Sequence, residues 1–453
     1  MLMRHPMNRR KFLKVGTQTL ASSTLLATLG GMERVLAAGS DTSGYKALVC
    51  IFLTGGNDSF NWIVPSDNAG YQVYQTSRRS LALPQNSLLP IAPAGIGAGQ
   101  YGLHASSSGV KTLFDSGKAA FVANVGTLVE PITRTQYLNR SVALPRFLFS
   151  HSDQQEQWMT SVPQSSVPSG WGGRIADLLS SQAGNPRLSF NISLSGSNVW
   201  QGGLNTQPYA LGTGGAPEFS VINDPSEPGD PYLELLNQAR THPSLLTREY
   251  AGVGNRSVDL AEFVNDSLAS VPELNTVFPN DRLGQQLKMT ARMIRARGAV
   301  GQSRQMFFIS YPDFDTHDEQ AGRLSSQLES LSAGLLAFQN AMAEINAEND
   351  VTTFTASDFG RTLTSNGDGS DHGWGGHALV VGGAVAGGRI YGTMPNLTIN
   401  GPDDAELGRI IPTLSTDQYG ATLARWFGVS ESDLGLVFPN LDHFGSSNLG
   451  FMG

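Results

Sequence analysis

Aspartate and histidine side chains recur in four short segments of this 453-residue chain, and together they could bind a metal ion. Each segment lies next to an apolar run, at 47–54, 306–311, 351–355 or 378–381. Mixed carboxylate and imidazole ligands suit Zn, Mn or Fe better than Mg or Ca. We therefore expect one or two divalent ions of this kind, although each residue alone could instead cap a helix, close a turn or donate to a carbonyl. The candidate ligands are Asp58, Asp315, His317, Asp358, Asp371, His372 and His377.

A hydroxyl group next to an imidazole is the second chemical feature. Ser150 and His151 stand at the predicted start of a short helix that runs to residue 159. A serine in such a place could attack phosphorus or sulfur if a neighbouring metal activated it. The alternative is ordinary N-capping by Ser150 or Ser152. Arg361 could hold an anionic oxygen through two hydrogen bonds, or pair with a nearby acid. The predicted catalytic residues are Ser150, His151 and Arg361.

Short strands alternating with long helices must position these groups. The apolar runs are nearly continuous, which is typical of strands buried on both faces. Amphipathic periodicity predicts helices at 281–297, 319–345 and 417–427. The fold class predicted is therefore α/β, a mostly parallel sheet with helices on both faces. Loops at the carboxyl ends of its strands would bring the polar segments together. The strands are expected at 47–54, 119–125, 188–194, 306–311, 351–355 and 378–381.

The N-terminal segment is interpreted as an export signal. Arg9 and Arg10 precede Phe-Leu-Lys and a weakly apolar stretch, a pattern that resembles a twin-arginine signal. We expect residues 1–38 to be removed and residues 39–453 to form a single domain. Residues 201–279 are predicted to be an insertion or cap. The protein is then expected to be periplasmic or extracellular, with the twin-arginine translocation machinery as a partner.

Composition excludes several other classes of protein. With 30 Lys and Arg against 38 Asp and Glu, the net charge of -8 disfavours nucleic-acid binding. A single cysteine, Cys50, allows no intrachain disulfide and no cysteine-based zinc or iron–sulfur site. We also expect no membrane span after signal cleavage, because no later apolar run approaches about 20 residues.

Several motifs together resemble the exported DUF1501 family, whose function is unassigned. That family looks like a distant branch of the alkaline phosphatase and sulfatase superfamily, which implies an alkaline-phosphatase-like fold. By that resemblance Asp58 would be the first metal ligand and Ser150 the nucleophile, and Asp315 with His317, then Asp358, then His372 or His377 would complete the set. The motifs are 55–61, Ser150-His151 with Asp153-Gln154, 170–174, 315–317, 357–362 and 371–374.

Two positions depart from the superfamily pattern. Its usual spacing of Asp and His would select Asp313, rather than Asp315, as the partner of His317. Phe359 stands where a histidine would follow Asp358, so one imidazole is missing.

These features predict an exported metal-dependent hydrolase, or a related transferase, that acts on small anionic phosphate or sulfate esters. The alternative is a secreted binding or assembly protein that keeps the fold with a degenerate site.

Overall fold

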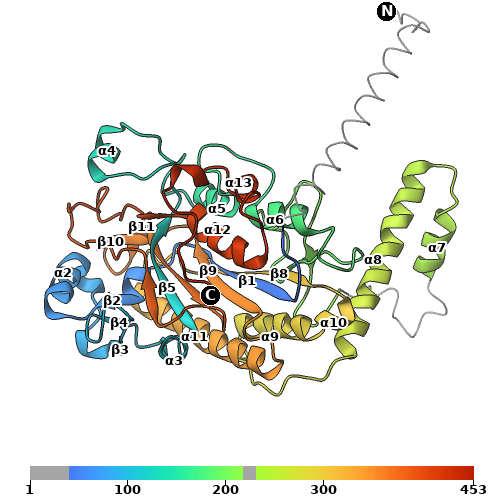
Figure 1. Cartoon of the computed structure of the whole chain (residues 1–453), viewed down its shortest axis with the longest axis horizontal. Coiled ribbons are helices and arrows are strands. Elements are labelled where there is room, and N and C mark those ends of the chain that lie inside the picture. Colours follow the sequence, from blue (N-terminus) through green and yellow to red (C-terminus); the bar gives the residue numbers. More distant parts are fainter. Residues whose placement is uncertain (1–39, 218–230) are drawn as a thin grey trace, which may run out of the picture.

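A nine-stranded mixed sheet forms the centre of the computed structural model, which describes residues 40–217 and 231–453 (Figure 1). The predicted export signal lies outside the described residues. Neighbouring strands run in the order β13 (Arg389–Tyr391), β5 (Ala119–Gly126), β12 (Gly376–Val381), β9 (Val351–Ser357), β1 (Lys46–Leu53), β8 (Arg304–Tyr311), β6 (Asn191–Ser193) and β7 (Tyr209–Ala210), and β14 (Leu414–Ser415) pairs with β5. β12 is antiparallel to both of its neighbours, and the other pairs are parallel.

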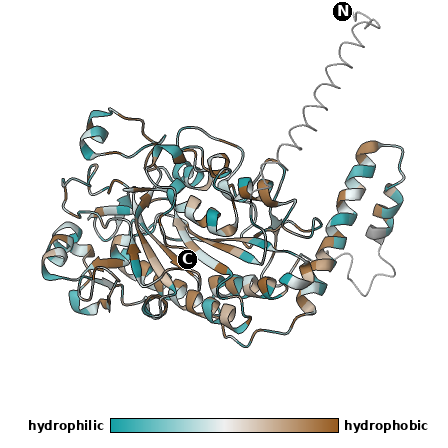
Figure 2. Cartoon of the chain, in the orientation of Figure 1, coloured by the Kyte–Doolittle hydropathy of each residue, from teal (hydrophilic) through white to brown (hydrophobic). Residues whose placement is uncertain are grey.

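Helices cover both faces of the sheet, as the buried strands require. Along β1, Val49 and Ile51 pack into one hydrophobic core, whereas Leu48, Cys50 and Phe52 pack into a second one. The first core includes α3 (Ser108–Asp115), α8 (Leu245–Ala269), α9 (Arg282–Arg295) and α11 (Gln320–Glu344); the second includes α5 (His151–Thr160), α6 (Trp171–Leu179), α12 (Thr416–Phe427) and α13 (Leu434–Val437). Hydrophobic residues gather on the strands between these layers (Figure 2). The predicted α/β class, its strands and its long helices are confirmed.

Two smaller sheets lie beside the main one and were not predicted. β2 (Ile63–Pro65), β4 (Tyr101–Leu103) and β3 (Leu89–Ile91) form an antiparallel sheet that α2 (Asn68–Arg78) contacts. β10 (Arg361–Ser365) and β11 (Ser370–His372) form a hairpin. β2, β3 and β4 have three residues each, and β10 and β11 are mostly polar, so periodicity could not identify them as strands.

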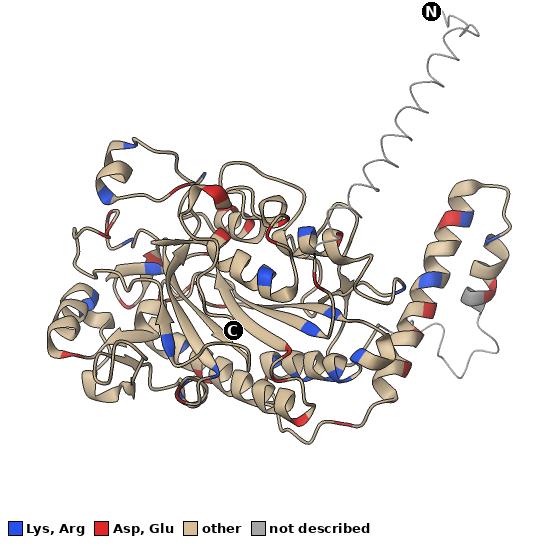
Figure 3. Ribbon diagram, viewed as in Figure 1, with Lys and Arg blue, Asp and Glu red and all other residues tan. Residues whose placement is uncertain are grey.

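The described part of residues 201–279 contains β7, which belongs to the main sheet, and the helices α7 (Pro231–Ala239) and α8, which project from one end of the molecule (Figure 1). β10 and β11 lie at the other end, so these helices do not cover that region. Acidic and basic residues are interspersed over helices and loops (Figure 3). Among the described residues, none of the helices is both long and apolar enough to span a membrane.

Candidate metal centre

One edge of the main sheet collects the chemically active segments. β8 and β9 are parallel, so the loops that follow them, with Asp315 and Asp358, leave at the same edge. β12 is antiparallel to β9 and therefore begins at that edge, which brings in His372 just before it. His151, the first residue of α5, completes the group. The strand-end argument therefore predicts correctly where these segments meet.

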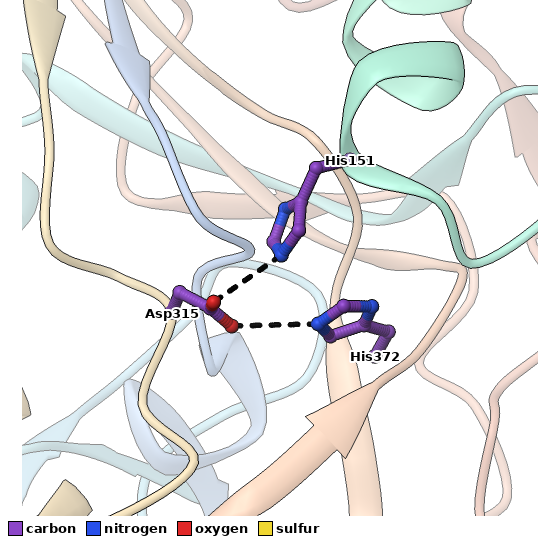
Figure 4. A group of neighbouring side chains, drawn as sticks. All are labelled: His151, Asp315 and His372. Carbon is purple, nitrogen blue, oxygen red and sulfur yellow. Dashed lines mark ion pairs between the residues drawn. The ribbon is translucent and has the colours of Figure 1, made fainter.

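His151, Asp315 and His372 form the centre of the site. Their ligand atoms all lie within 4.8 Å of one another, and they are the one group of its kind in the described part of the chain (Figure 4). His151 Nε2 lies 3.4 Å from Asp315 Oδ2, and His372 Nε2 lies 3.4 Å from Asp315 Oδ1. Two ligands of a tetrahedral ion, each about 2.0 to 2.2 Å from it, are roughly 3.3 to 3.6 Å apart. Both distances between Asp315 and the histidines therefore fit the spacing of two ligands of one ion.

The hydrogen bonds of the two imidazoles leave the correct nitrogens free. His151 donates from Nδ1 to Asp358 Oδ2 (2.7 Å), and His372 donates from Nδ1 to the Phe149 carbonyl (2.7 Å). These acceptors place a ring proton on Nδ1, so in the neutral imidazole the lone pair of each Nε2 faces Asp315. His151 Nε2 is buried and has no hydrogen-bond partner. Metal-binding histidines are oriented by the same kind of bond.

His317 adjoins this group on its more exposed side. Its Nε2 lies 3.0 Å from Asp315 Oδ1 and 2.9 Å from His372 Nε2, and its Nδ1 donates to Asp371 Oδ1 (3.2 Å). At this distance a proton must lie between the two nitrogens, because two ligands of one ion would be farther apart. His317 is the nearest further imidazole to the central group, and Asp371 orients it.

The pKa values of the central residues differ according to their neighbours. The hydrogen bond to Asp358 raises the pKa of His151 above its usual value. Burial lowers the pKa of His372, which favours the neutral imidazole that a metal needs. Burial alone would raise the pKa of Asp315, but the hydrogen bond and charge of Arg361, with the charges of His151 and His317, lower it. Asp315 is therefore a carboxylate.

Arg361 is fully buried and is not free to bind a substrate. Its Nη1 donates to Asp315 Oδ1 (2.6 Å) and to the Gly55 carbonyl (3.2 Å), while Nη2 donates to the Ser370 carbonyl. The proposed clamp on an anionic oxygen is therefore not what this geometry supports. The alternative expectation, an ion pair with a nearby acid, describes Arg361.

Asp58 lies away from the central group. Its Oδ2 is paired with Arg78 of α2 and accepts a hydrogen bond from Gln320, and all three side chains are buried. The sequence offered no sign of this partner, because Arg78 stands in a helix without any motif. Because Asp58 is fully buried and its carboxylate is not among the ligand atoms that gather around Asp315, it is not placed to be the first ligand of that ion.

Asp358 holds an imidazole and does not belong to the central group. Its buried carboxylate accepts from the Gly55 amide (3.1 Å) on Oδ1, and from His151 and Gln155 Nε2 (2.8 Å) on Oδ2. Gln155 was missed, although it stands four residues after His151 and so shares its helix face. Phe359 stacks on His372 and also packs against His151, with ring centroids 4.9 and 4.8 Å apart.

His377 is buried elsewhere. Its Nδ1 accepts from the Asn124 amide (3.1 Å), and burial lowers its pKa to about 3. Asp313 is likewise outside the group, because its backbone turns at φ 76° before Asp315. The superfamily spacing that favours Asp313 is therefore not followed here.

Ser150 occupies the N-cap position of α5 but makes no capping hydrogen bond. Its hydroxyl donates to Asp153 Oδ2 (2.6 Å) and lies 3.3 Å from Ser152 Oγ. The simple capping alternative for Ser150 is therefore not supported. The hydroxyl adjoins His151 in sequence and points to a carboxylate that can hold its proton.

A family model described as "Protein of unknown function (DUF1501)" matches residues 265–406. The match confirms the resemblance expected from the motifs, and it includes Asp315, Asp358 and His372 but not Asp58 or His151. No curated protein matches the chain.

Two solved structures are similar over most of the chain at low scores. A crystal structure of Ps i-CgsB in complex with k-i-k-neocarrahexaose has a TM-score of 0.35 and 10% identity, and covers 87% of this chain and 74% of its own. The lipoteichoic acid synthase LtaP from Listeria monocytogenes has a TM-score of 0.30 and 8% identity, and covers 79% of this chain and 69% of its own. Scores this low carry no argument about function.

Proposed function

We propose that this protein is an exported, metal-dependent hydrolase or related transferase that acts on small phosphate or sulfate esters. The observation that carries the proposal is the arrangement of His151 and His372. Both rings donate from Nδ1, and both present Nε2 to the carboxylate of Asp315. Structures that only need to bury a histidine have no reason to aim two lone pairs at one carboxylate.

The donor set fits Zn, Mn or Fe, with His151, Asp315 and His372 as ligands and His317 beside them. Such an ion would supply Lewis-acid stabilisation of negative charge on a phosphoryl or sulfuryl oxygen. Asp358 also supports a cation here. Its carboxylate is fully buried and pairs with His151, so a cation on the far side of that imidazole would compensate the charge.

Ser150 supplies the nucleophile in this proposal. Its hydroxyl donates to Asp153, which would accept the proton when the oxygen attacks, and the N-terminus of α5 would favour negative charge that develops beside it. His151 and His372 keep their orientation throughout, because each Nδ1 stays hydrogen-bonded.

Export is proposed from the twin-arginine pattern of the N-terminal segment, in which Arg9 and Arg10 precede Phe-Leu-Lys. In the described chain, the Asp41 amide donates to the Gly428 carbonyl (3.0 Å), and Arg304 Nη2 donates to the Asp41 carbonyl (2.5 Å), so residue 41 belongs to the folded domain.

The test is a screen of aryl phosphate and aryl sulfate esters with Zn, Mn or Fe. The intact protein should release phenol only with metal, and Asp315→Ala should abolish this release while remaining folded. A protein that binds metal but hydrolyses none of these esters would favour the binding or assembly alternative. Release that is equal in Asp315→Ala would contradict the assignment of the site.

A further inference from the structure

One glutamine connects two ion pairs, each of which contains a buried arginine. Arg78 pairs with Asp58, and Arg361 pairs with Asp315; both arginines are completely buried. Gln320, the first residue of α11, is also completely buried. Its side chain connects the first pair, through Ser370, to the second.

The direction of every hydrogen bond in this connection is fixed by the charge of Asp58. The carboxylate can only accept, so it must receive the Nε2 amide of Gln320. The Oε1 of Gln320 is then left to accept from the Ser370 hydroxyl (2.5 Å). Because the Ser370 hydroxyl donates its hydrogen to Gln320, its oxygen can accept a hydrogen bond from Arg361 Nε (3.4 Å).

These hydrogen bonds orient the side chain of Arg361. Ser370 accepts from it twice, through its hydroxyl and its backbone carbonyl. The remaining Nη1 then donates to Asp315 Oδ1, the oxygen that His372 also faces, whereas His151 faces Oδ2. Asp315 is thus held by an arginine whose position depends on Ser370.

We propose that Gln320 is a positioning residue for the metal centre, and that Asp58 acts through it rather than by binding the ion. This inference rests on the proposed centre and adds to it the residues that hold Asp315 in place. It also explains how loss of Asp58 could weaken metal binding even though Asp58 contacts no ion.

The test compares metal dissociation constants of Gln320→Met and Gln339→Met with that of the intact protein. Gln339 is a matched control, because it is also a buried glutamine of α11 that donates to a carboxylate, Glu348 (3.2 Å). Competition with a fluorescent chelator would measure Zn²⁺ affinity, and thermal unfolding without metal would measure the cost to the fold.

We expect Gln320→Met to weaken Zn²⁺ binding by up to about 10-fold, because direct partners of metal ligands contribute about 10- to 100-fold and Gln320 acts on Asp315 through Ser370 and Arg361. The Zn²⁺ dissociation constant of Gln339→Met should stay within twofold of that of the intact protein, even if this variant unfolds at the same temperature as Gln320→Met. Equal affinities for Gln320→Met and the intact protein, or equal losses in both variants, would overturn the inference.

Ser370→Ala provides a second route if Gln320→Met does not fold. It removes the same link without changing α11 and should also weaken Zn²⁺ binding by up to about 10-fold; unchanged affinity would again overturn the inference. An intact protein that binds no metal would refute the proposed centre itself, and the inference with it. Metal binding that is indifferent to Gln320 and Ser370 would refute the inference alone.

Discussion

Replacing Asp358 by asparagine should weaken metal binding without removing any ligand. Asp358 is fully buried, and its Oδ2 receives two donors, His151 Nδ1 at 2.7 Å and Gln155 Nε2 at 2.8 Å. In Asp358→Asn, a side-chain NH₂ group at the Oδ2 position would face two hydrogen-bond donors, His151 Nδ1 and Gln155 Nε2, and could not accept from either. At the Oδ1 position it would face the backbone N–H of Gly55, which is also a donor. Neither orientation satisfies all the groups.

The imidazole can relieve this conflict by moving its proton. If the asparagine amide donates to Nδ1 of His151, the ring proton transfers to Nε2, where the metal requires a lone pair. Outer partners of metal-binding histidines contribute about 10- to 100-fold in affinity, or about 1.4 to 2.7 kcal/mol. We expect a loss within this range.

Competition titration with a chelator at neutral pH would measure the change, with thermal unfolding of the metal-free protein as a check on the fold. Asp371→Asn is the natural control, because Asp371 orients the more exposed His317 and is itself more than half exposed. Water can replace that partner, so its loss should weaken binding less. Unchanged affinity in Asp358→Asn, or a larger loss in Asp371→Asn, would refute the reasoning.

Three further predictions test other parts of the site. A methyl group added at Gly55 (φ 117°) would lie 2.3 Å from the Asp315 amide, so Gly55→Ala should lose metal, whereas Gly44→Ala (φ 65°, with nothing within 4 Å) should retain it; equal metal contents by elemental analysis would contradict this. Ser150→Ala should abolish ester hydrolysis while keeping full metal content, and hydrolysis at the original rate would exclude the hydroxyl as nucleophile. Burial lowers the pKa of His377 to about 3, whereas an unfolded histidine has a pKa of about 6.5. As the pH falls below about 6.5, the unfolded chain therefore takes up a proton that the folded protein does not. The free energy of unfolding should then decrease toward pH 3, by at most about 1.4 kcal/mol per pH unit. Urea unfolding at pH 7.5, 6 and 5 should show that His377→Asn, which keeps an acceptor for the backbone amide, loses this contribution; an unchanged pH dependence would count against it.

The architecture was predictable because buried strands have continuous apolar runs and helices have a regular period. The same logic brought Asp315, Asp358 and His372 to one edge of the sheet, since strand direction determines where loops meet. It could not tell which of these groups face one another, because that depends on hydrogen bonds between distant segments.

Asp58 shows this limit most clearly. Its position after the first strand made it a ligand candidate. In the structure, however, Asp58 forms an ion pair with Arg78, which lies in a helix that carries no recognisable motif. Arg361 was expected either to clamp an anion or to pair with an acid, and only its burial in the structure decides between these. Likewise, the sequence does not indicate that the backbone at Asp313 is left-handed (φ 76°). Nor does it show that Asp315, rather than Asp313, belongs to the group of candidate ligands.

The most direct test of the central claim is elemental analysis by mass spectrometry of the protein purified without chelator from its native compartment or a homologous host. Asp315→Ala and His372→Ala would be purified alongside it, with thermal unfolding to confirm that they fold. The metal centre predicts about one equivalent of Zn, Mn or Fe in the intact protein, or two if His317 and Asp371 hold a second ion, and loss of this metal in both variants. Folded intact protein that contains no metal above background, and that takes up none on titration, would contradict it.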